Sequence, residues 1–532
     1  MKNILKSFIA ALVAFSFFSC TKADEERFIS TDILSIDQLA AYEMGTVEVQ
    51  ITSNVNWIME LPSWVMSSME CGSGDAKITL SFKDNMNESA RTGTIRISGG
   101  GSYDGNGVAH TITVSQNAYD VTEYLQYLET CEVLGGIPDE AEFAQFIRAA
   151  NLGYPLRRWT DAATGEILLM SDIDLTNTSV DWQFALNKTN VSNTANGCTP
   201  NNNNKFTGKF NGQDHRITGF NPSVKLQNSD SFGLFNVAEG ASIRNLILSG
   251  AMNVYATGQS DVGMLVGTAK NVTVENVTVS GTIASTGISV TDERFCIGGV
   301  CGFAYGTAAS PTVFDYCTSE IAVQAVGGKN IKYGATAAMY GGIVGFATGP
   351  NAAGEFVKIC NCENNGDMTV TLGRCSGIVA TAYAGVTIQD CVNNGSQANA
   401  IANGRLGNIT CFLAKNGKVI NCVNNGDLET TNEFYSGTMG GLVALIQDSN
   451  AVISDGGNYG ALRTYDTAAN YGMIVSYIDT FKKIENVEVG GELWINGEQV
   501  EMNGTNFMDY FGVHSSEANK TKVTGSTFVP VE

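Results

Sequence analysis

The stretch ICNCENNGDMTV (residues 359–370) returns twice more along the chain, as IQDCVNNGSQA (388–398) and VINCVNNGDLE (419–429). The three copies share an apolar residue, an Asn or Asp two positions later, and then a cysteine. A glycine follows four positions after that cysteine. A chain that spells one short pattern again and again uses it once in each structural unit. The fold therefore depends on what this pattern does.

The pattern extends well beyond these three copies when the cysteine position is also allowed to be apolar. The glycines of the first and last copies, Gly250 and Gly491, are 241 residues apart over seven intervals, which gives a mean period of about 34 residues. The copies begin at Ile243, Val274, Ile359, Ile388, Val419, Ile453 and Ile484, with a degenerate copy, lacking the glycine, at Phe314.

A second signal precedes every copy. It is a short apolar run that contains glycine, in the order FGLF, VGMLVG, GGVCG, GGIVG, SGIVA, LGNIT, GGLVA and YGMIV. One unit has two short apolar runs and cannot bury them alone, whereas stacked units bury them as a continuous core. We predict that equivalent strands of successive units lie parallel, about 4.8 Å apart, so that like residues stack on like.

The pattern itself is interpreted as a corner. The apolar residue and the cysteine are three positions apart, so a straight strand would point them to opposite faces. Both can face inward if the Asn or Asp between them bends the chain. We expect the Asn-Gly that follows to supply the positive φ of a second corner.

Four cysteines share one position of the repeat and are expected to form a column inside the stack, acting as small apolar residues. They are Cys317, Cys362, Cys391 and Cys422. Disulfides between neighbours stay an open alternative, because stacked Cα atoms need not have suitable Cβ geometry.

The repeat resembles the GLUG-type repeat of the pectin-lyase-like right-handed β-helix, over about residues 139–500. The segments ILLMSDIDLTN, FTGKFNGQDHRITGF and FGLF are similar to the first coils of that family. The resemblance implies a surface adhesin or passenger-like protein, although the wider fold also includes polysaccharide lyases and hydrolases.

A helix is predicted just before the array, in IPDEAEFAQFIRAANLG (137–153). Pro138 begins it and Gly153 lies past its end. Its apolar side chains recur with helical spacing, at Phe143, Phe146, Ile147 and Ala150. We expect it to cover the open end of the stack, within a domain spanning 138–532 that follows a linker at 119–137.

Residues 30–118 alternate apolar and polar residues with period two, which predicts a small antiparallel sandwich. Its landmarks are SNVNWIMELPSWV, NESARTGTIRI and VSQNA. They resemble the BACON domain, an immunoglobulin-like module whose family is thought to bind carbohydrate or mucin. Trp57, Trp64 and Tyr103 are weak candidates for carbohydrate binding, since a strand tryptophan is more often core and Tyr103 lies in a hairpin loop.

The first twenty residues are a basic start followed by an apolar run that ends at Cys20. They resemble a bacterial lipoprotein signal, which implies lipid attachment at Cys20 and an outer-membrane protein, with an ordinary secretory signal as the alternative. Residues 21–29 form an acidic tether that resembles a surface-export tag. No later run of 18 apolar residues follows.

The composition is typical of an all-β protein. Charged residues are 16%, Gly is 59 of 532 and Pro is only 8. The formal net charge of −22 argues against nucleic acid or anionic lipid as a partner. The predicted fold class is all-β: an immunoglobulin-like sandwich followed by a right-handed parallel β-helix with a short helical N-cap.

No catalytic, metal or cofactor site is predicted. The three histidines are scattered and no CxxC pair occurs. Asp172 and Asp174, and the run Asp214-His215-Arg216, are interpreted as structural turns. We predict noncatalytic binding of a glycan, a mucin-type carbohydrate or a host surface protein, or adhesion. The alternatives are a polysaccharide lyase or glycosidase in a groove, and a stalk without a ligand.

Overall fold

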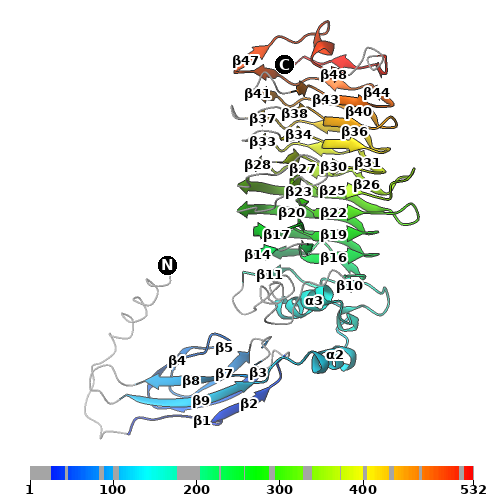
Figure 1. Cartoon of the computed structure of the whole chain (residues 1–532). Helices are drawn as coiled ribbons and strands as arrows, with labels where there is room; N and C mark the ends of the chain where they lie inside the picture. Colours follow the sequence, from blue (N-terminus) through cyan, green and yellow to red (C-terminus); the bar gives the residue numbers. More distant parts are fainter. Residues whose placement is uncertain are drawn as a thin grey trace. The chain divides into compact units, whose positions relative to one another are not determined.

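In a computed structural model, the chain forms two compact units, Met1–Asp120 and Val121–Glu532, shown in Figure 1. The structure describes residues 26–41, 46–82, 85, 89–99, 107–176, 204–226, 229–256, 258–286, 294–326, 338–371, 373–399, 404–430, 437–465, 470–514 and 521–530. The predicted signal, Cys20 and Tyr103 lie outside these residues.

The first unit is the predicted β-sandwich. Its strands bury alternate side chains, as the period-two pattern requires, and the two buried faces form one core around Trp57, Ile95 and Val114. Among the described residues of this unit, all strand pairs are antiparallel except β2 with β9. One sheet has the order β1(Ile29–Thr31), β3(Thr46–Ser53), β7(Ala76–Phe82), β5(Val65–Ser67). The other has the order β2(Ser35–Leu39), β9(Val108–Gln116), β8(Arg91–Gly99), β4(Asn56–Glu60), β6(Cys71–Ser73).

Two helices open the second unit. Helix α2 (Val121–Thr130) occupies part of the predicted linker. Helix α3 (Glu140–Leu152) begins two residues later than the proline suggested, because Asp139 is the N-cap and its side chain accepts the N–H of Glu142. Gly153 ends the helix with a φ of 69°.

Helix α3 covers the first strands of the stack that follows it, as expected of a cap. Beyond its own helix, Phe146 packs against four aromatic rings, those of Trp159, Phe206, Phe210 and Phe235, at centroid distances of 5.6–6.4 Å. The side chain of Asn151 also accepts the N–H of Asn236, so the end of the helix is bonded to the stack.

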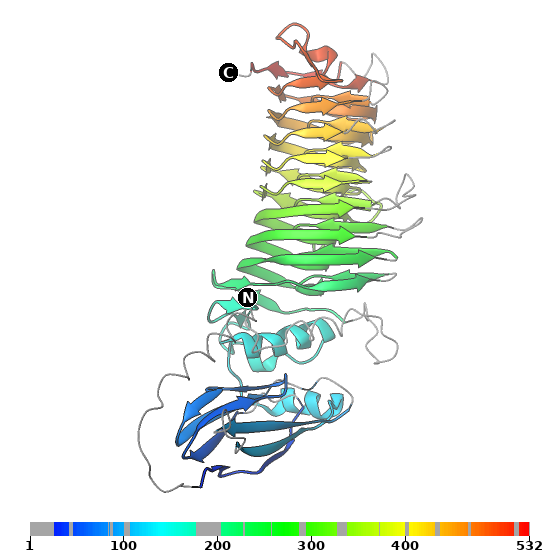
Figure 2. The same ribbon diagram turned by 90° about the vertical axis from the view of Figure 1, so that its left-hand side faces the viewer.

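The rest of the second unit is built from three sheets whose strands are parallel, which confirms the predicted stacking (Figures 1 and 2). An eight-stranded sheet contains β15(Asp230–Phe232), β18(Ser260–Gly263), β21(Phe295–Gly298), β24(Ala338–Gly341), β29(Arg374–Ser376), β34(Arg405–Gly407), β38(Thr438–Gly440) and β42(Asn470–Gly472). A nine-stranded sheet contains β16(Phe235–Glu239), β19(Val266–Lys270), β22(Cys301–Tyr305), β25(Val344–Thr348), β30(Val379–Ala382), β35(Thr410–Ala414), β39(Val443–Gln447), β43(Val475–Thr480) and β48(Val513–His514).

The third sheet holds 24 strands and contains every copy of the repeated pattern. Its short first strands are β10(Ile167–Leu168), β11(Ile173–Asp174), β12(Lys209–Asn211), β13(Arg216–Thr218) and β14(Ser223–Leu226). They are followed by β17(Ser242–Ala256), β20(Thr273–Thr286), β23(Thr312–Val326), β26(Val357–Cys360), β27(Glu363–Asn364), β28(Met368–Val370), β31(Val386–Gln389), β32(Val392–Asn393), β33(Gln397–Asn399), β36(Lys418–Asn424) and β37(Leu428–Thr430). The last are β40(Val452–Asn458), β41(Leu462–Thr464), β44(Lys483–Glu485), β45(Glu488–Val489), β46(Leu493–Ile495), β47(Glu498–Val500), β49(Val523–Thr524) and β50(Thr527–Phe528), with β46 and β47 antiparallel.

One pass through the three sheets is called a coil below, and equivalent residues of successive coils lie in register. The first apolar residue of each pattern pairs with that of the next, as Ile359 does with Ile388 and Ile388 with Val419. Ile484 pairs in turn with Val523, so the stack continues past the last copy recognised in the sequence.

The Asn or Asp of the pattern makes the predicted bend. The residue at this position has a φ between 49° and 59° in all eight copies, including Tyr316 of the degenerate one. The others are Asn245, Asn276, Asn361, Asp390, Asn421, Asp455 and Asn486. The left-handed conformation turns the chain so that both flanking side chains, such as Ile359 and Cys362, are buried.

The second expectation, that the following glycine supplies a positive φ, is wrong for most copies. Gly281 has a φ of 118°, but Gly366, Gly395 and Gly426 are not in the left-handed region. They are glycines because neighbouring coils approach too closely for a side chain. A β-carbon built on Gly395 would lie 2.1 Å from the carbonyl oxygen of Gly366.

Candidate functional site

The repeated cysteines form a column of buried thiols in successive coils. Each is a free cysteine, and its Sγ donates to a carbonyl of the preceding coil, as Cys391 does to Ile359 O over 3.4 Å. Burial raises the pKa of the thiols of Cys362, Cys391 and Cys422 well above the usual value. The thiols therefore act as apolar core groups with weak hydrogen bonds.

This burial predicts slow thiol chemistry. In the native protein we expect iodoacetamide at pH 8 to alkylate the exposed Cys71 and to leave Cys362, Cys391 and Cys422 unmodified, because the thiolate is the reactive form and burial disfavours it. Peptide mass spectrometry after a timed pulse measures each site, and the same pulse in urea shows that all four can react. If all four cysteines are labelled equally in the native protein, the burial of the three repeated cysteines is contradicted.

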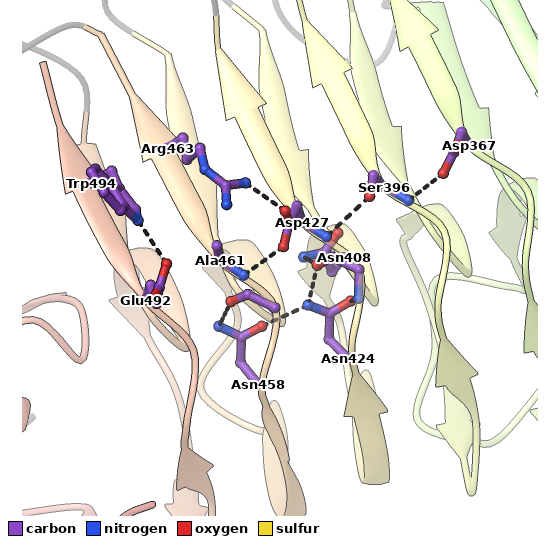
Figure 3. A network of polar contacts seen from close by, with 12 residues as sticks. Asp367, Ser396, Asn408, Asn424, Asp427, Asn458, Ala461, Arg463, Glu492 and Trp494 are labelled. Carbon is purple, nitrogen blue, oxygen red and sulfur yellow. Dashed lines mark hydrogen bonds and ion pairs between the residues drawn. The ribbon is translucent and has the colours of Figure 1, made fainter. Parts of the chain in front are cut away.

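The Asn two residues before the glycine forms a second buried column in four consecutive copies of the pattern. Asn364, Asn393, Asn424 and Asn458 are fully buried. Each Nδ2 donates to the Oδ1 of the next Asn, over 2.8, 2.7 and 2.6 Å in order. Each also donates to the carbonyl of the glycine two residues on, for example Asn424 to Gly426 O at 2.7 Å. Figure 3 shows the link between Asn424 and Asn458. These asparagines were expected to form a turn, so this column was not predicted from the sequence.

The outward positions of the last coils carry a different set of residues, here called the lateral strip. It consists of Asp427, Glu429, Arg463, Glu492 and Trp494, on or beside β37, β41 and β46. Figure 3 labels all of them except Glu429. Glu429 pairs in register with Arg463, and Arg463 with Trp494, so the three lie on successive strands. The strip therefore brings an aromatic ring, a cation and carboxylates onto one outer face.

Contacts within the lateral strip hold its polar groups in place. Asp427 accepts the N–H of Ala461 at 2.8 Å and forms an ion pair with Arg463. The Nε1 of Trp494 donates to Glu492 over 2.9 Å. The hydrogen bond to Asp427 raises the pKa of Arg463, and the charges of the nearby glutamates raise it further. No residue of this strip was predicted from the sequence to have a functional role.

The sandwich tryptophans have structural partners. Trp57 is only 1% exposed and its Nε1 donates to Gly74 O at 3.0 Å, so it is a core residue and presents no face to a ligand. Trp64 is half-buried, and the guanidinium of Arg91 lies 4.5 Å from its ring centroid. A β-carbon on Gly93 would lie 3.2 Å from the Trp64 ring. The sequence landmarks of this domain thus gather in one packed cluster.

The structure brings together two segments that were interpreted from the sequence as structural turns. His215 Nδ1 lies 3.0 Å from Asp172 Oδ1 on the surface. The N–H of Arg216, and then His215, lower the pKa of Asp172, while Thr176 lowers that of Asp174. Carboxyls with lowered pKa values stay ionised at neutral pH, which is the opposite of what a general acid needs.

A buried ion pair was not predicted. Arg294 Nη2 donates to both carboxylate oxygens of Asp261, at 3.1 and 2.8 Å, and its guanidinium lies 4.2 Å from the Phe303 ring centroid. Burial raises the pKa of Asp261 while the charge of Arg294 lowers it. Thr268 also donates to Asp261, so the carboxylate oxygens are already occupied by the protein's own donors.

Within the described ranges, no group of three or more His, Cys, Asp or Glu side chains could hold a metal ion. The described helices also include none long and apolar enough to cross a membrane.

The strand order, the buried Trp57 and the Trp64–Arg91–Gly93 cluster of the first unit can now be compared with known families. Residues 47–117 match the BACON family. The family model is described as "Putative binding domain, N-terminal". The BACON match covers most of the sandwich and leaves the second unit unassigned. A search among curated proteins finds no match to the chain.

Several solved structures share a distant likeness. A "putative immunoglobulin A1 protease" from Bacteroides ovatus is 14% identical, with a TM-score of 0.33 over 74% of this chain and 84% of that chain. An "IgA1 Protease" is 12% identical, with a TM-score of 0.33 over 93% of this chain and 27% of that one. A Bacteroides ovatus GH5 xyloglucanase is 14% identical, with a TM-score of 0.16 over 36% and 45%. These scores are too low to support any conclusion about activity.

Proposed function

We propose that the protein is a noncatalytic glycan-binding or adhesion lipoprotein of the bacterial outer surface. In this proposal Cys20 carries the lipid, residues 21–29 form the tether, and the second unit is a right-handed parallel β-helix of the GLUG type. Its partner is a glycan, a mucin-type carbohydrate or a host surface protein.

The observation that carries the proposal is the match of residues 47–117 to a binding-domain family. It is supported by the three parallel sheets of the second unit, because a stack of coils offers an extended lateral surface on which repeated positions line up. The buried state of Trp57 limits what the sandwich itself can present, so we place recognition on other surfaces, including that of the second unit.

A glycan microarray with the soluble chain Thr21–Glu532 tests the proposal. We expect retention on a subset of glycans, without release of soluble sugar from the corresponding polysaccharides, because a binding protein holds its ligand intact. The control is the same chain unfolded in urea and then diluted onto the array. Released oligosaccharide would replace the proposal with a lyase or glycosidase. If the chain binds no glycan on the array, the remaining explanations are a protein partner or a stalk without a ligand.

A further inference from the structure

We infer that the lateral strip is a subsite for a neutral sugar, which stacks on Trp494 and is held by hydroxyl hydrogen bonds to Glu429 and Arg463. This inference rests on the proposed function and adds to it a place on the molecule and a ligand class.

The aromatic ring is placed where the stack does not need it. Positions in register along this outer row are occupied by Thr369, Ala398, Glu429 and Arg463 before Trp494 is reached. Small and polar side chains thus suffice for the fold at this position, and a tryptophan adds a partly exposed aromatic side chain. The axial C–H groups of a pyranose ring pack on such a face, and an indole provides a large one.

The ring is also oriented by a hydrogen bond. Its Nε1 donates to Glu492 at 2.9 Å, which restrains the indole before any ligand arrives (Figure 3). A preorganised side chain loses less entropy on binding than a free one. This arrangement differs from Trp64, whose ring already has the Arg91 guanidinium over it.

Unused donors and acceptors lie beside the ring. Asp427 bonds Nη1 of Arg463 and directs the guanidinium, and the remaining N–H groups of Arg463 have no hydrogen bond within the described residues. Glu429, exposed and opposite Arg463, likewise has no hydrogen-bond partner in the described part of the chain. The guanidinium can donate hydrogen bonds and the carboxylate can accept them, and the two lie on adjacent strands about 4.8 Å apart. They therefore suit two hydroxyl groups of one sugar ring.

The charge of the strip selects among glycans. Three carboxylates surround one guanidinium, on a chain whose formal net charge is −22. A uronic acid or sulfated sugar would be repelled, whereas neutral hydroxyls lose nothing from this field. A basic peptide is the competing ligand that the same charge would admit, and the experiment separates the two.

Affinity gel electrophoresis of Thr21–Glu532 tests the inference, with soluble neutral glucan, mannan, xylan and galactan in the gel and polygalacturonate as the acidic comparison. We expect retardation by at least one neutral polysaccharide and none by polygalacturonate. Trp494→Ala and Arg463→Ala should each weaken that retardation at least about ten-fold, and Trp494→Phe should weaken it less.

The matched control is Tyr477→Ala, which removes an aromatic side chain that is 40% exposed on β43, in another sheet, and should leave retardation unchanged. Unchanged circular dichroism and unreactive Cys391 show that each variant is folded. If the unmodified chain binds a neutral polysaccharide and Trp494→Ala binds it equally well, the inference fails and the proposed function stands. If the unmodified chain binds no polysaccharide, the inference fails; if it then binds oligolysine through Trp494, a protein is the partner that the proposed function retains.

Discussion

Replacing Gly395 with alanine is expected to destabilise the second unit by about 3 kcal/mol or more, because the added methyl group cannot be accommodated by a side-chain movement. The β-carbon would lie 2.1 Å from the carbonyl oxygen of Gly366 and 2.7 Å from its carbon, both backbone atoms. This clash can be relieved only if the two coils move apart, and that movement breaks hydrogen bonds between them. A urea titration followed by alkylation of Cys391 reports this unit alone, because Cys391 belongs to it, while the cysteine that the structure describes in the first unit is the exposed Cys71.

The control for this prediction is Gly504→Ala. No atom lies within 4 Å of a β-carbon built at Gly504, and its φ is not in the left-handed region, so we expect a change within about 0.5 kcal/mol. A Gly395→Ala protein as stable as Gly504→Ala would show that the coils are farther apart than the structure places them.

One part of the corner could be predicted from the sequence and another could not. The bend at Asn361 or Asp390 is a local matter, because the flanking apolar positions are three apart and must both be buried, and the left-handed φ follows. The need for Gly395 arises between coils 29 residues apart. A sequence pattern shows that glycine recurs at this position. It does not show whether glycine is required by a positive φ or by the close approach of the neighbouring coil, and the structure shows that the close approach is the reason.

The lateral strip could not be predicted from the sequence, for a related reason. Trp57 was visible as a tryptophan on an alternating strand, and its burial agrees with the core interpretation given to most strand tryptophans. Trp494 has no motif around it. It becomes notable only when register places it beside Arg463 and near Glu429, which come from two earlier coils. Asp261 and Arg294 are likewise joined across 33 residues of sequence.

Replacing Asn393 with alanine is expected to cost about 2–5 kcal/mol, because it breaks the amide column in the middle and leaves two buried groups short of a partner. The Nδ2 of Asn364 loses its acceptor and the Oδ1 of Asn424 loses its donor. The control is Asn394→Ala, which removes an exposed neighbour that bonds Glu363 and Asn365. We expect the control to cost under about 1 kcal/mol in the same urea titration.

Asn393→Asp separates the loss of a hydrogen bond from the burial of a charge. An ionised carboxylate at this place would still accept from Asn364 but would face the Oδ1 of Asn424 with no proton between them. Burial and this repulsion raise the folded-state pKa of the new carboxyl above its unfolded value of about 3.9. The unfolded chain then ionises first, so the variant loses stability as the pH rises through about 4, by about 1.4 kcal/mol for each unit of pKa shift. A variant whose stability relative to the unmodified chain stays constant from pH 4 to 7 would mean that position 393 is hydrated, and the buried amide column would have to be abandoned.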